Sequence, residues 1–234
     1  MRQTEGVEPR DPDEDVRRIS APAITEGDAT GWFDQLYAEA AKGQAVVPWD
    51  RGGPHPLLVE WFERHERPTT KRTLVVGSGF GEDAAYLARQ GLGVIGFDIS
   101  AEAVRAARRR FPSVPVDFRV ADLLNPPSEW HQHFDLVVES YTVQALPVRL
   151  RRTAVTHETR FVSPGGTLLV LAAARDAADD ELPGPPWPLT RSDIESFATE
   201  GLVAVEVEEL REPPDIHRWR AEFRRPARSP SASQ

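Results

Sequence analysis

Residues Thr73–Ser100 read TLVVGSGFGEDAAYLARQGLGVIGFDIS and predict a strand, a glycine-rich turn, a helix and a returning strand. The turn contains Gly77, Gly79 and Gly81, which allow positive φ angles and leave no Cβ between the backbone and a ligand. The returning strand ends on Asp98, about 20 residues after the first glycine. This spacing is typical of units in which a carboxylate accepts hydrogen bonds from a ribose, so it predicts a nucleoside ligand.

The helix that follows the turn begins with two acids, Glu82 and Asp83. A helix N-terminus normally attracts anions, and two carboxylates there oppose a pyrophosphate. The predicted ligand therefore carries no phosphate and has a positive charge, which describes S-adenosylmethionine. The alternatives are a nicotinamide dinucleotide, and with it an oxidoreductase, or a turn that only packs a helix on a strand. Titration with S-adenosylmethionine and with a nicotinamide dinucleotide distinguishes the first interpretation from the oxidoreductase.

Three further motifs follow in order: Val120–Leu123 (VADL), Phe134–Glu139 (FDLVVE) and Pro164–Val170 (PGGTLLV). From Thr73 to about Leu171 the pattern resembles the class I SAM-dependent methyltransferases. The resemblance implies an α/β fold with a Rossmann-like, doubly wound, seven-stranded and mostly parallel sheet, an antiparallel last strand and an N-terminal helical cap. Residues 202–210 and 217–223 alternate in polarity and predict the closing antiparallel hairpin.

The same resemblance implies a cofactor, S-adenosylmethionine, and a product, S-adenosylhomocysteine. In that family the backbone at Gly77 and Gly79 meets the methionyl end of the cofactor. The acid at Asp98 holds the ribose and the acid at Asp122 reads the adenine amino group. The predicted cofactor-binding residues are Gly77, Ser78, Gly79, Gly81, Asp98, Ile99, Asp122, Leu123 and Glu139.

A second resemblance concerns the methyl acceptor. Residues Pro48–Leu57 read PWDRGGPHPL and resemble a segment of the thiopurine and thiol/halide methyltransferase group. It implies an acceptor that is a thiol or other soft nucleophile on an aromatic or heterocyclic compound. Residues Glu139–Leu146, ESYTVQAL, depart from the acceptor motif of that group. O- or N-methylation of a small secondary metabolite or heterocycle therefore stays open, as does a non-catalytic SAM-binding regulatory subunit.

Aromatic residues in two proline-rich loops, Trp49 and Trp187, are predicted to form the substrate pocket together with Tyr141. Methyl transfer from a sulfonium mainly requires that donor and acceptor are held in line and that water is excluded. A thiol is partly ionised near neutral pH, whereas a phenol benefits from a general base. The candidate bases are Glu139, Tyr141 and His55, and each has a purely structural alternative.

The overall composition of the chain narrows the range of binding partners that we expect. The net charge of -9 argues against a surface that binds nucleic acid, and the chain has no cysteine, hence no disulfide or thiolate chemistry. His131 and His133 form an H-x-H pair without a suitably spaced third ligand, so no metal is expected. We expect a cytoplasmic enzyme that acts on a small molecule, without nucleic acid or membrane partners, as a monomer or weak homodimer.

The chain divides into three parts by composition. Residues 1–25 are acidic and poor in periodic apolar positions, which predicts a disordered arm, with a small lid as the alternative. Residues 26–226 form a single methyltransferase domain with an N-terminal cap at 26–66 and a Rossmann-like core at 71–226. Residues 227–234 are predicted to be a disordered tail.

Overall fold

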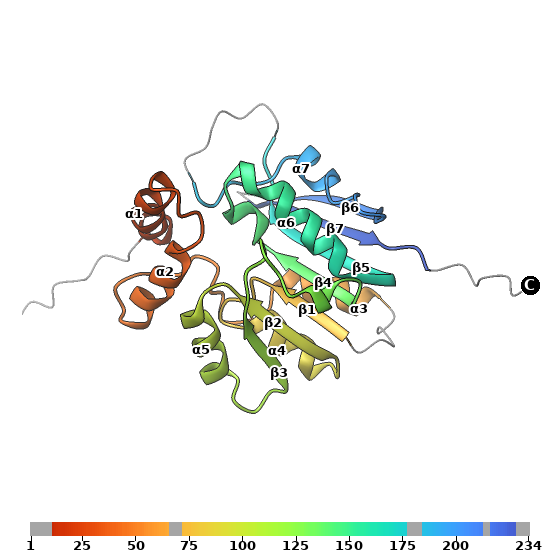
Figure 1. Ribbon diagram of the computed structural model, residues 1–234, viewed down its shortest axis with the longest axis horizontal. Coiled ribbons are helices and arrows are strands. Elements are labelled where there is room, and N and C mark those ends of the chain that lie inside the picture. The colour runs from red at the N-terminus through yellow and green to blue at the C-terminus, as the bar shows by residue number, and fades with distance from the viewer. Residues whose placement is uncertain (1–10, 66–71, 177–183, 213–215, 228–234) are drawn as a thin grey trace, which may run out of the picture.

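The computed structural model describes residues 11–65, 72–176, 184–212 and 216–227, and these form a seven-stranded sheet with helices on both faces (Figure 1). The strand order is β3-β2-β1-β4-β5-β7-β6, with β7 antiparallel to both β5 and β6. This confirms the predicted fold class and the closing hairpin. The strands are β1 (Arg72–Val76), β2 (Gly93–Asp98), β3 (Val116–Val120), β4 (Phe134–Ser140), β5 (Val162–Ala173), β6 (Val203–Glu212) and β7 (Ile216–Arg224).

Helix starts follow local sequence signals. Ser100 Oγ accepts a hydrogen bond from the Ala103 amide at 3.0 Å, and Thr190 forms a capping box with Asp193. In the part of the chain that the structure describes, no helix is long and apolar enough to cross a membrane. The helices are α1 (Pro12–Thr25), α2 (Trp32–Ala41), α3 (Pro56–Arg64), α4 (Glu82–Arg89), α5 (Ala101–Arg110), α6 (Val148–Phe161) and α7 (Arg191–Glu195), with short 3-10 turns η1 (Ser128–Trp130) and η2 (Val143–Ala145).

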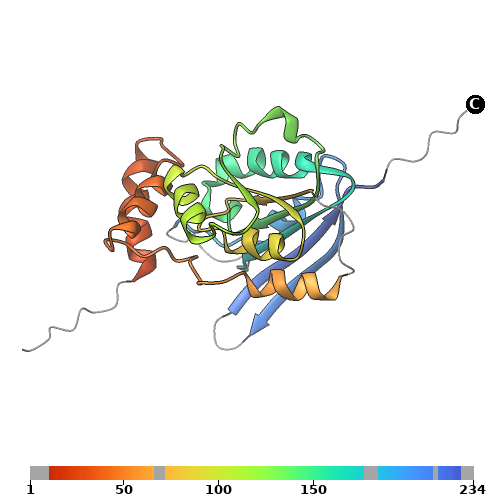
Figure 2. The ribbon, with the colours of Figure 1, turned by 90° about the horizontal axis from the view of Figure 1, so that it is seen from below.

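Both faces of the sheet are buried, which explains why its central strands are nearly continuous apolar runs. Along β4, Val137 points into one core, whereas Leu136 and Val138 point into the other. The first core packs under α6 and the second under α3, α4 and α5. Figure 2 shows α6 on one side of the sheet and α3 and α4 on the other. The carboxyl ends of β1 to β4 therefore form a single edge at which loops meet.

Helix α1 corrects the prediction of a disordered arm at 1–25. Val16 is fully buried and Ile19 is 4% exposed, and both pack in a third apolar cluster with Trp32 and Leu36. The helix is also tied to its surroundings by a 2.8 Å ion pair between Arg18 and Glu39. Residues 1–10 and 228–234, which make up the rest of the predicted arm and nearly all of the predicted tail, lie outside the described residues.

The physical reason for this error is that α1 has a narrow apolar stripe. Its few apolar residues are too sparse to indicate a helix with a core of its own, and an isolated helix of this length is marginal in water. These few residues are enough to hold α1 in place because α2 supplies an apolar surface on which they pack. Figure 1 shows the two helices side by side. Asp15 adds a hydrogen bond from the Val46 amide at 3.0 Å.

Candidate active site

Two adjoining cavities lie along the carboxyl edge of the parallel strands. Counted out to their openings and including solvent space, the first encloses about 660 Å³ and the second about 470 Å³. They share the walls formed by Trp49, Gly77, Ser140 and Tyr141. The first cavity extends from these walls to Asp98, Asp122 and helix α2, and the second extends to the acidic start of α4.

Most of the predicted cofactor residues line these cavities. The first cavity contains Asp98 and Asp122 at the ends of β2 and β3, and the second contains the glycine turn after β1. No arginine or lysine is among the described residues that line the first cavity, so its wall suits a nucleoside without phosphate. The predicted residues in the first cavity are Gly77, Asp98, Ile99, Asp122 and Leu123, and those in the second are Gly77, Ser78 and Gly79.

The carboxylate of Asp98 is held across the glycine turn. Its Oδ2 accepts a hydrogen bond from the Gly79 amide at 2.9 Å and its Oδ1 accepts one from the Ser100 amide at 2.9 Å. The residue is 6% exposed, and burial raises its pKa to about 6 despite these amide donors. While it is ionised, this carboxylate can accept hydrogen bonds from both ribose hydroxyls, whereas protonation turns one oxygen into a donor and reduces this acceptor capacity.

Cofactor affinity should therefore depend on pH. As pH falls through about 6, Asp98 gains a proton and loses its capacity to accept two hydroxyl donors. We expect the dissociation constant for S-adenosylmethionine to be flat above this pH and to rise by about tenfold per pH unit below it. Calorimetric titrations between pH 4.5 and 8 measure this. Asp98→Asn is the matched control, because it keeps the size of the side chain and should bind weakly at every pH. A wild-type affinity that stays constant down to pH 4.5 would contradict the assignment.

The three glycines of the turn have different roles. A Cβ on Gly79 would lie 2.9 Å from the hydroxyl oxygen of Tyr37, and one on Gly77 would overlap the Thr142 hydroxyl. These two glycines therefore keep the cavity walls free of side chains. Gly81 lines neither cavity, and a Cβ there would lie 2.6 Å from the ring of Phe118. The structure therefore gives Gly81 a packing role at the start of α4, and its contact with the cofactor stays a prediction.

Glu139 was predicted to bind cofactor or act as a base, and the structure places it elsewhere. Its side chain is fully buried and lines neither cavity. Its Oε1 accepts hydrogen bonds from the amides of Thr142 at 2.7 Å and Val143 at 3.0 Å. Burial raises its pKa to about 7. Glu139 thus stabilises the turn after β4 by accepting hydrogen bonds from its amides. An acid at the end of a strand can cap the following turn in this way instead of reaching a ligand.

His55 and Trp187 also lie outside both cavities. His55 is 1% exposed and caps α3, with its Nδ1 accepting a hydrogen bond from the Leu57 amide at 3.1 Å. The Trp187 indole packs against Gly184, and its amide donates to the Gln144 carbonyl at 2.8 Å. The preceding part of the Trp187 loop, residues 177–183, lies outside the described residues. Of the predicted pocket and catalytic residues, Trp49 and Tyr141 line the cavities.

Helix α2 supplies site residues that the sequence did not reveal. Tyr37 is buried, lines the first cavity and accepts a 2.7 Å hydrogen bond from the Trp49 indole. Phe33 and Thr30 line the same cavity. The amphipathic pattern of residues 32–40 predicts a packing face, which is correct for Trp32 and Leu36. That pattern cannot show which of these aromatic residues faces a ligand.

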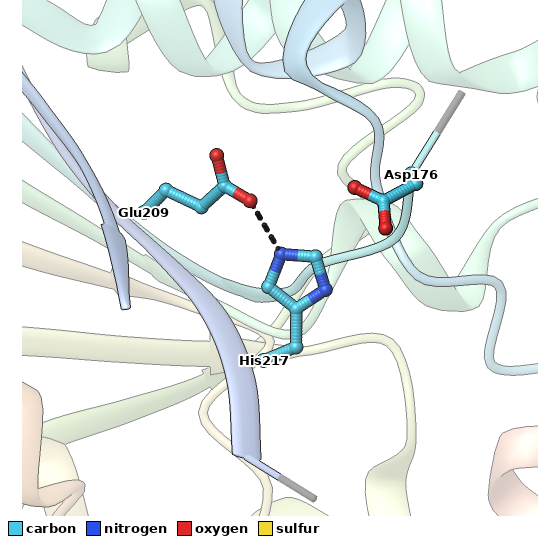
Figure 3. Close-up of side chains that lie close together, drawn as sticks. All are labelled: Asp176, Glu209 and His217. Atoms are coloured by element: carbon cyan, nitrogen blue, oxygen red, sulfur yellow. Dashed lines mark hydrogen bonds and ion pairs between the residues drawn. The ribbon is translucent and has the colours of Figure 1, made fainter. Parts of the chain in front are cut away.

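A separate group of polar side chains lies near the sheet edge of β6 and β7. Figure 3 shows Glu209 pointing at the ring of His217, with Asp176 beyond it. His217 Nε2 lies 2.8 Å from Glu209 Oε1, and the three side chains are close enough to hold an ion. However, Arg211 makes ion pairs with Asp176 at 2.7 Å and Glu209 at 2.6 Å. This cation satisfies both carboxylates, so the group forms a surface ion-pair network.

Comparison with known proteins shows which family and which relatives this chain resembles. The family model for thiopurine S-methyltransferase (TPMT) matches residues 39–224. Thiocyanate methyltransferase 1 of Brassica oleracea is 27% identical over 201 residues, which cover 85% of this chain and 83% of that protein. A 2-heptyl-1-hydroxyquinolin-4(1H)-one methyltransferase of Mycobacteroides abscessus is 28% identical over 160 residues, or 65% of this chain and 68% of that protein.

Solved structures share the fold at lower sequence identity. The N-methyltransferase NodS from Bradyrhizobium japonicum WM9, in complex with S-adenosyl-L-homocysteine, superimposes with a TM-score of 0.64 at 20% identity. The match covers 82% of this chain and 99% of that one. A protein from echinomycin biosynthesis, associated with conversion of a disulfide bond into a thioacetal group, gives a TM-score of 0.68 at 24% identity. It covers 84% of this chain and 94% of that one.

Proposed function

The chain belongs to the thiopurine S-methyltransferase family, and we propose that it methylates a small aromatic or heterocyclic thiol, or another soft nucleophile that is already ionised. S-Adenosylmethionine is the methyl donor and S-adenosylhomocysteine the product. The first cavity is the proposed nucleoside site, with Asp98 toward the ribose. The second cavity, lined by Trp49, Arg51 and Tyr141, is the proposed meeting point of methyl group and acceptor.

The choice of acceptor rests on the protonation states of the side chains around the second cavity. Burial, together with the charges of Arg51 and Arg218, lowers the pKa of His55 to about 3, so the imidazole is neutral. Because its Nδ1 accepts from the Leu57 amide, its proton is on Nε2, and that nitrogen cannot accept another. Burial raises the pKa of Tyr141, so its hydroxyl also keeps its proton. None of the three predicted bases is therefore available, which favours an acceptor that needs none.

The charges in the second cavity support the same conclusion. Arg51 lies in its wall, with the guanidinium carbon 4.8 Å from the centroid of the Tyr141 ring. A cation at this position stabilises an anionic acceptor such as a thiolate. The same cavity is lined by the carboxylates of Glu82 and Asp83, which suit a positively charged cofactor, although Glu82 also forms an ion pair with Arg110 at 2.6 Å. The residues thus favour a cationic donor and an anionic acceptor in adjoining spaces.

The chain's own contribution to the reaction is to bind, orient and exclude water. S-Adenosylmethionine supplies the methyl group, which the acceptor takes in an in-line displacement. Asp98 and the glycine turn would hold the nucleoside and the methionyl end. We also propose that α1, α2 and the Trp49 loop act as a cap, supported by the contact of Tyr37 with Trp49 over the glycine turn.

A panel of acceptors tests the proposed function. Aromatic thiols, halide ions, phenols and N-heterocycles are incubated with the enzyme and S-adenosylmethionine, and release of S-adenosylhomocysteine is measured. We expect thiols to be turned over at least about 100-fold faster than phenols of similar size, because phenols require a general base. The Mycobacteroides relative, which by its name acts on a hydroxyquinolinone, makes O-methylation the second candidate. Turnover of phenols with inert thiols would select it.

Arg51 should affect the acceptor rather than the cofactor. We expect Arg51→Gln to raise KM for an ionised thiol by about 3- to 10-fold, since an exposed cation contributes modestly. KM for S-adenosylmethionine should change less than twofold, within the scatter of about 0.5 kcal/mol typical of surface changes. Arg89→Gln is the matched control, because Arg89 also stacks on a ring, that of Phe111, but lines neither cavity. Equal effects of the two substitutions would show that Arg51 does not act on the acceptor.

A further inference from the structure

Tyr141 has an unusual backbone at the junction of the two cavities. Its φ angle is 63°, in the left-handed region that residues other than glycine rarely adopt. The conformation is held by a 2.9 Å hydrogen bond from its amide to the Leu171 carbonyl, and by Glu139, which binds the amides of the next two residues. A strained backbone that is held this firmly points to a side chain whose direction matters.

The direction of the hydroxyl follows from its neighbours. His55 stacks on the Tyr141 ring at a centroid distance of 5.4 Å, with Nε2 3.4 Å from the hydroxyl oxygen. Because Nδ1 is occupied by the Leu57 amide, Nε2 carries the proton and donates to Tyr141. The guanidinium carbon of Arg51 lies 4.8 Å from the centroid of the same ring. The lone pair that receives the Nε2 proton is thereby used, and the hydroxyl proton cannot point back toward His55.

The proton of the hydroxyl is left to point elsewhere. Among the described residues, no carbonyl or side chain is seen to accept it, and Tyr141 lines both cavities. We propose that Tyr141 donates a hydrogen bond to the methyl acceptor and that His55 is a positioning residue that sets this direction. This inference rests on the proposed function for the identity of the acceptor, and it assigns roles that differ from the proton-accepting roles predicted for both residues.

The partner of this hydrogen bond should be an atom other than the reacting sulfur. A donor on the sulfur would withdraw negative charge from the thiolate and lower its nucleophilicity toward the methyl group. A donor on a second atom, such as a ring nitrogen, leaves the sulfur free and fixes its orientation. The site would therefore distinguish acceptors that carry a second hydrogen-bond acceptor from those that carry only sulfur.

Two thiols of nearly equal size test this at a mildly alkaline pH at which both are thiolates: pyridine-3-thiol, whose ring nitrogen is then unprotonated, and thiophenol, which has no ring nitrogen. We expect Tyr141→Phe to lower kcat/KM for pyridine-3-thiol by about 5- to 30-fold, the effect of losing one hydrogen bond, and to change kcat/KM for thiophenol by less than twofold. His55→Asn should produce a similar selective loss. Asparagine can still cap α3 but lacks a donor at the Nε2 position, whereas His55→Gln places a donor there and should restore much of the preference.

Binding measurements separate this inference from the proposed function. Dissociation constants of both thiols for the enzyme saturated with S-adenosylhomocysteine need no turnover, and the wild type should prefer pyridine-3-thiol. If it binds with this preference but neither thiol is methylated, the proposed function fails and the role of Tyr141 stands. Tyr86→Phe, outside both cavities, controls for loss of a phenolic hydroxyl. Equal losses for the two thiols in Tyr141→Phe, or no loss, would overturn the proposal.

Discussion

Replacing Gly79 with valine is expected to raise the dissociation constant for S-adenosylmethionine by more than about 100-fold, a loss of roughly 2.7 kcal/mol. Gly79 has a φ angle of 52°, and its amide donates to Asp98. A Cβ there would approach the Tyr37 hydroxyl to 2.9 Å, and the two methyl groups of valine would fill space in the second cavity. The substitution thus removes room for the ligand and disturbs the group that holds its ribose.

Gly91→Val separates these effects from backbone strain. Gly91 also has a positive φ, of 91°, but a Cβ there would have no neighbour within 4 Å. Both variants should lose some stability, because a β-branched residue is unfavourable in this conformation. Urea unfolding checks that each variant is folded, and calorimetric titration then measures its affinity for S-adenosylmethionine. Of the two variants, we expect only Gly91→Val to bind with near wild-type affinity. If Gly79→Val also binds normally, the cofactor does not lie against this turn.

Ile19→Ala should lower the free energy of unfolding by about 2 to 5 kcal/mol, which is a large share of the stability of a single domain. Ile19 is 4% exposed in the cluster that joins α1 to α2, so its truncation leaves a cavity. Because Tyr37 belongs to the same cluster and lines the first cavity, affinity for S-adenosylmethionine should fall as well.

Urea unfolding measures this change, and Arg17→Ala is the control. Arg17 is on the same helix, with a side chain that is 45% exposed, and its ion pair with Asp11 at 3.7 Å is solvent-exposed. Its removal should change stability by less than about 1 kcal/mol. An Ile19→Ala variant as stable as the wild type would mean that α1 does not pack on α2, and would restore the prediction of a disordered arm.

Local sequence spacing was enough to predict that a glycine turn and a carboxylate meet at one edge of the sheet. The positions of Gly77, Gly79 and Asp98 relative to one strand, one turn and one helix are set within a single βαβ unit, where chain geometry leaves little choice. The same short-range geometry sets the helix caps at Ser100 and Thr190, which depend on residues within one helical turn. These caps form where the sequence places them because their partners are close in sequence.

Residues whose role depends on distant partners were predicted less well. Glu139 follows a strand as a ligand residue would, but its carboxylate turns under the chain to the amides of Thr142 and Val143. Gly81 is the third glycine of the motif, yet Phe118 of a different strand occupies the space beside it. Trp187 is in a loop typical of a binding site, but its indole packs on Gly184.

The sequence by itself determined the α/β fold, the glycine turn and the acid that follows it, because periodicity and short-range spacing are properties of the chain. Only the tertiary structure decided that α1 is folded, that Tyr37 faces the site, and that His55 is a hydrogen-bond donor rather than a base. Each of these depends on burial beside residues remote in sequence: α2 for Ile19, the Trp49 loop for Tyr37, and Tyr141 for His55. Burial and hydrogen-bond partners set protonation and direction, and neither is encoded in the spacing of residues along the chain.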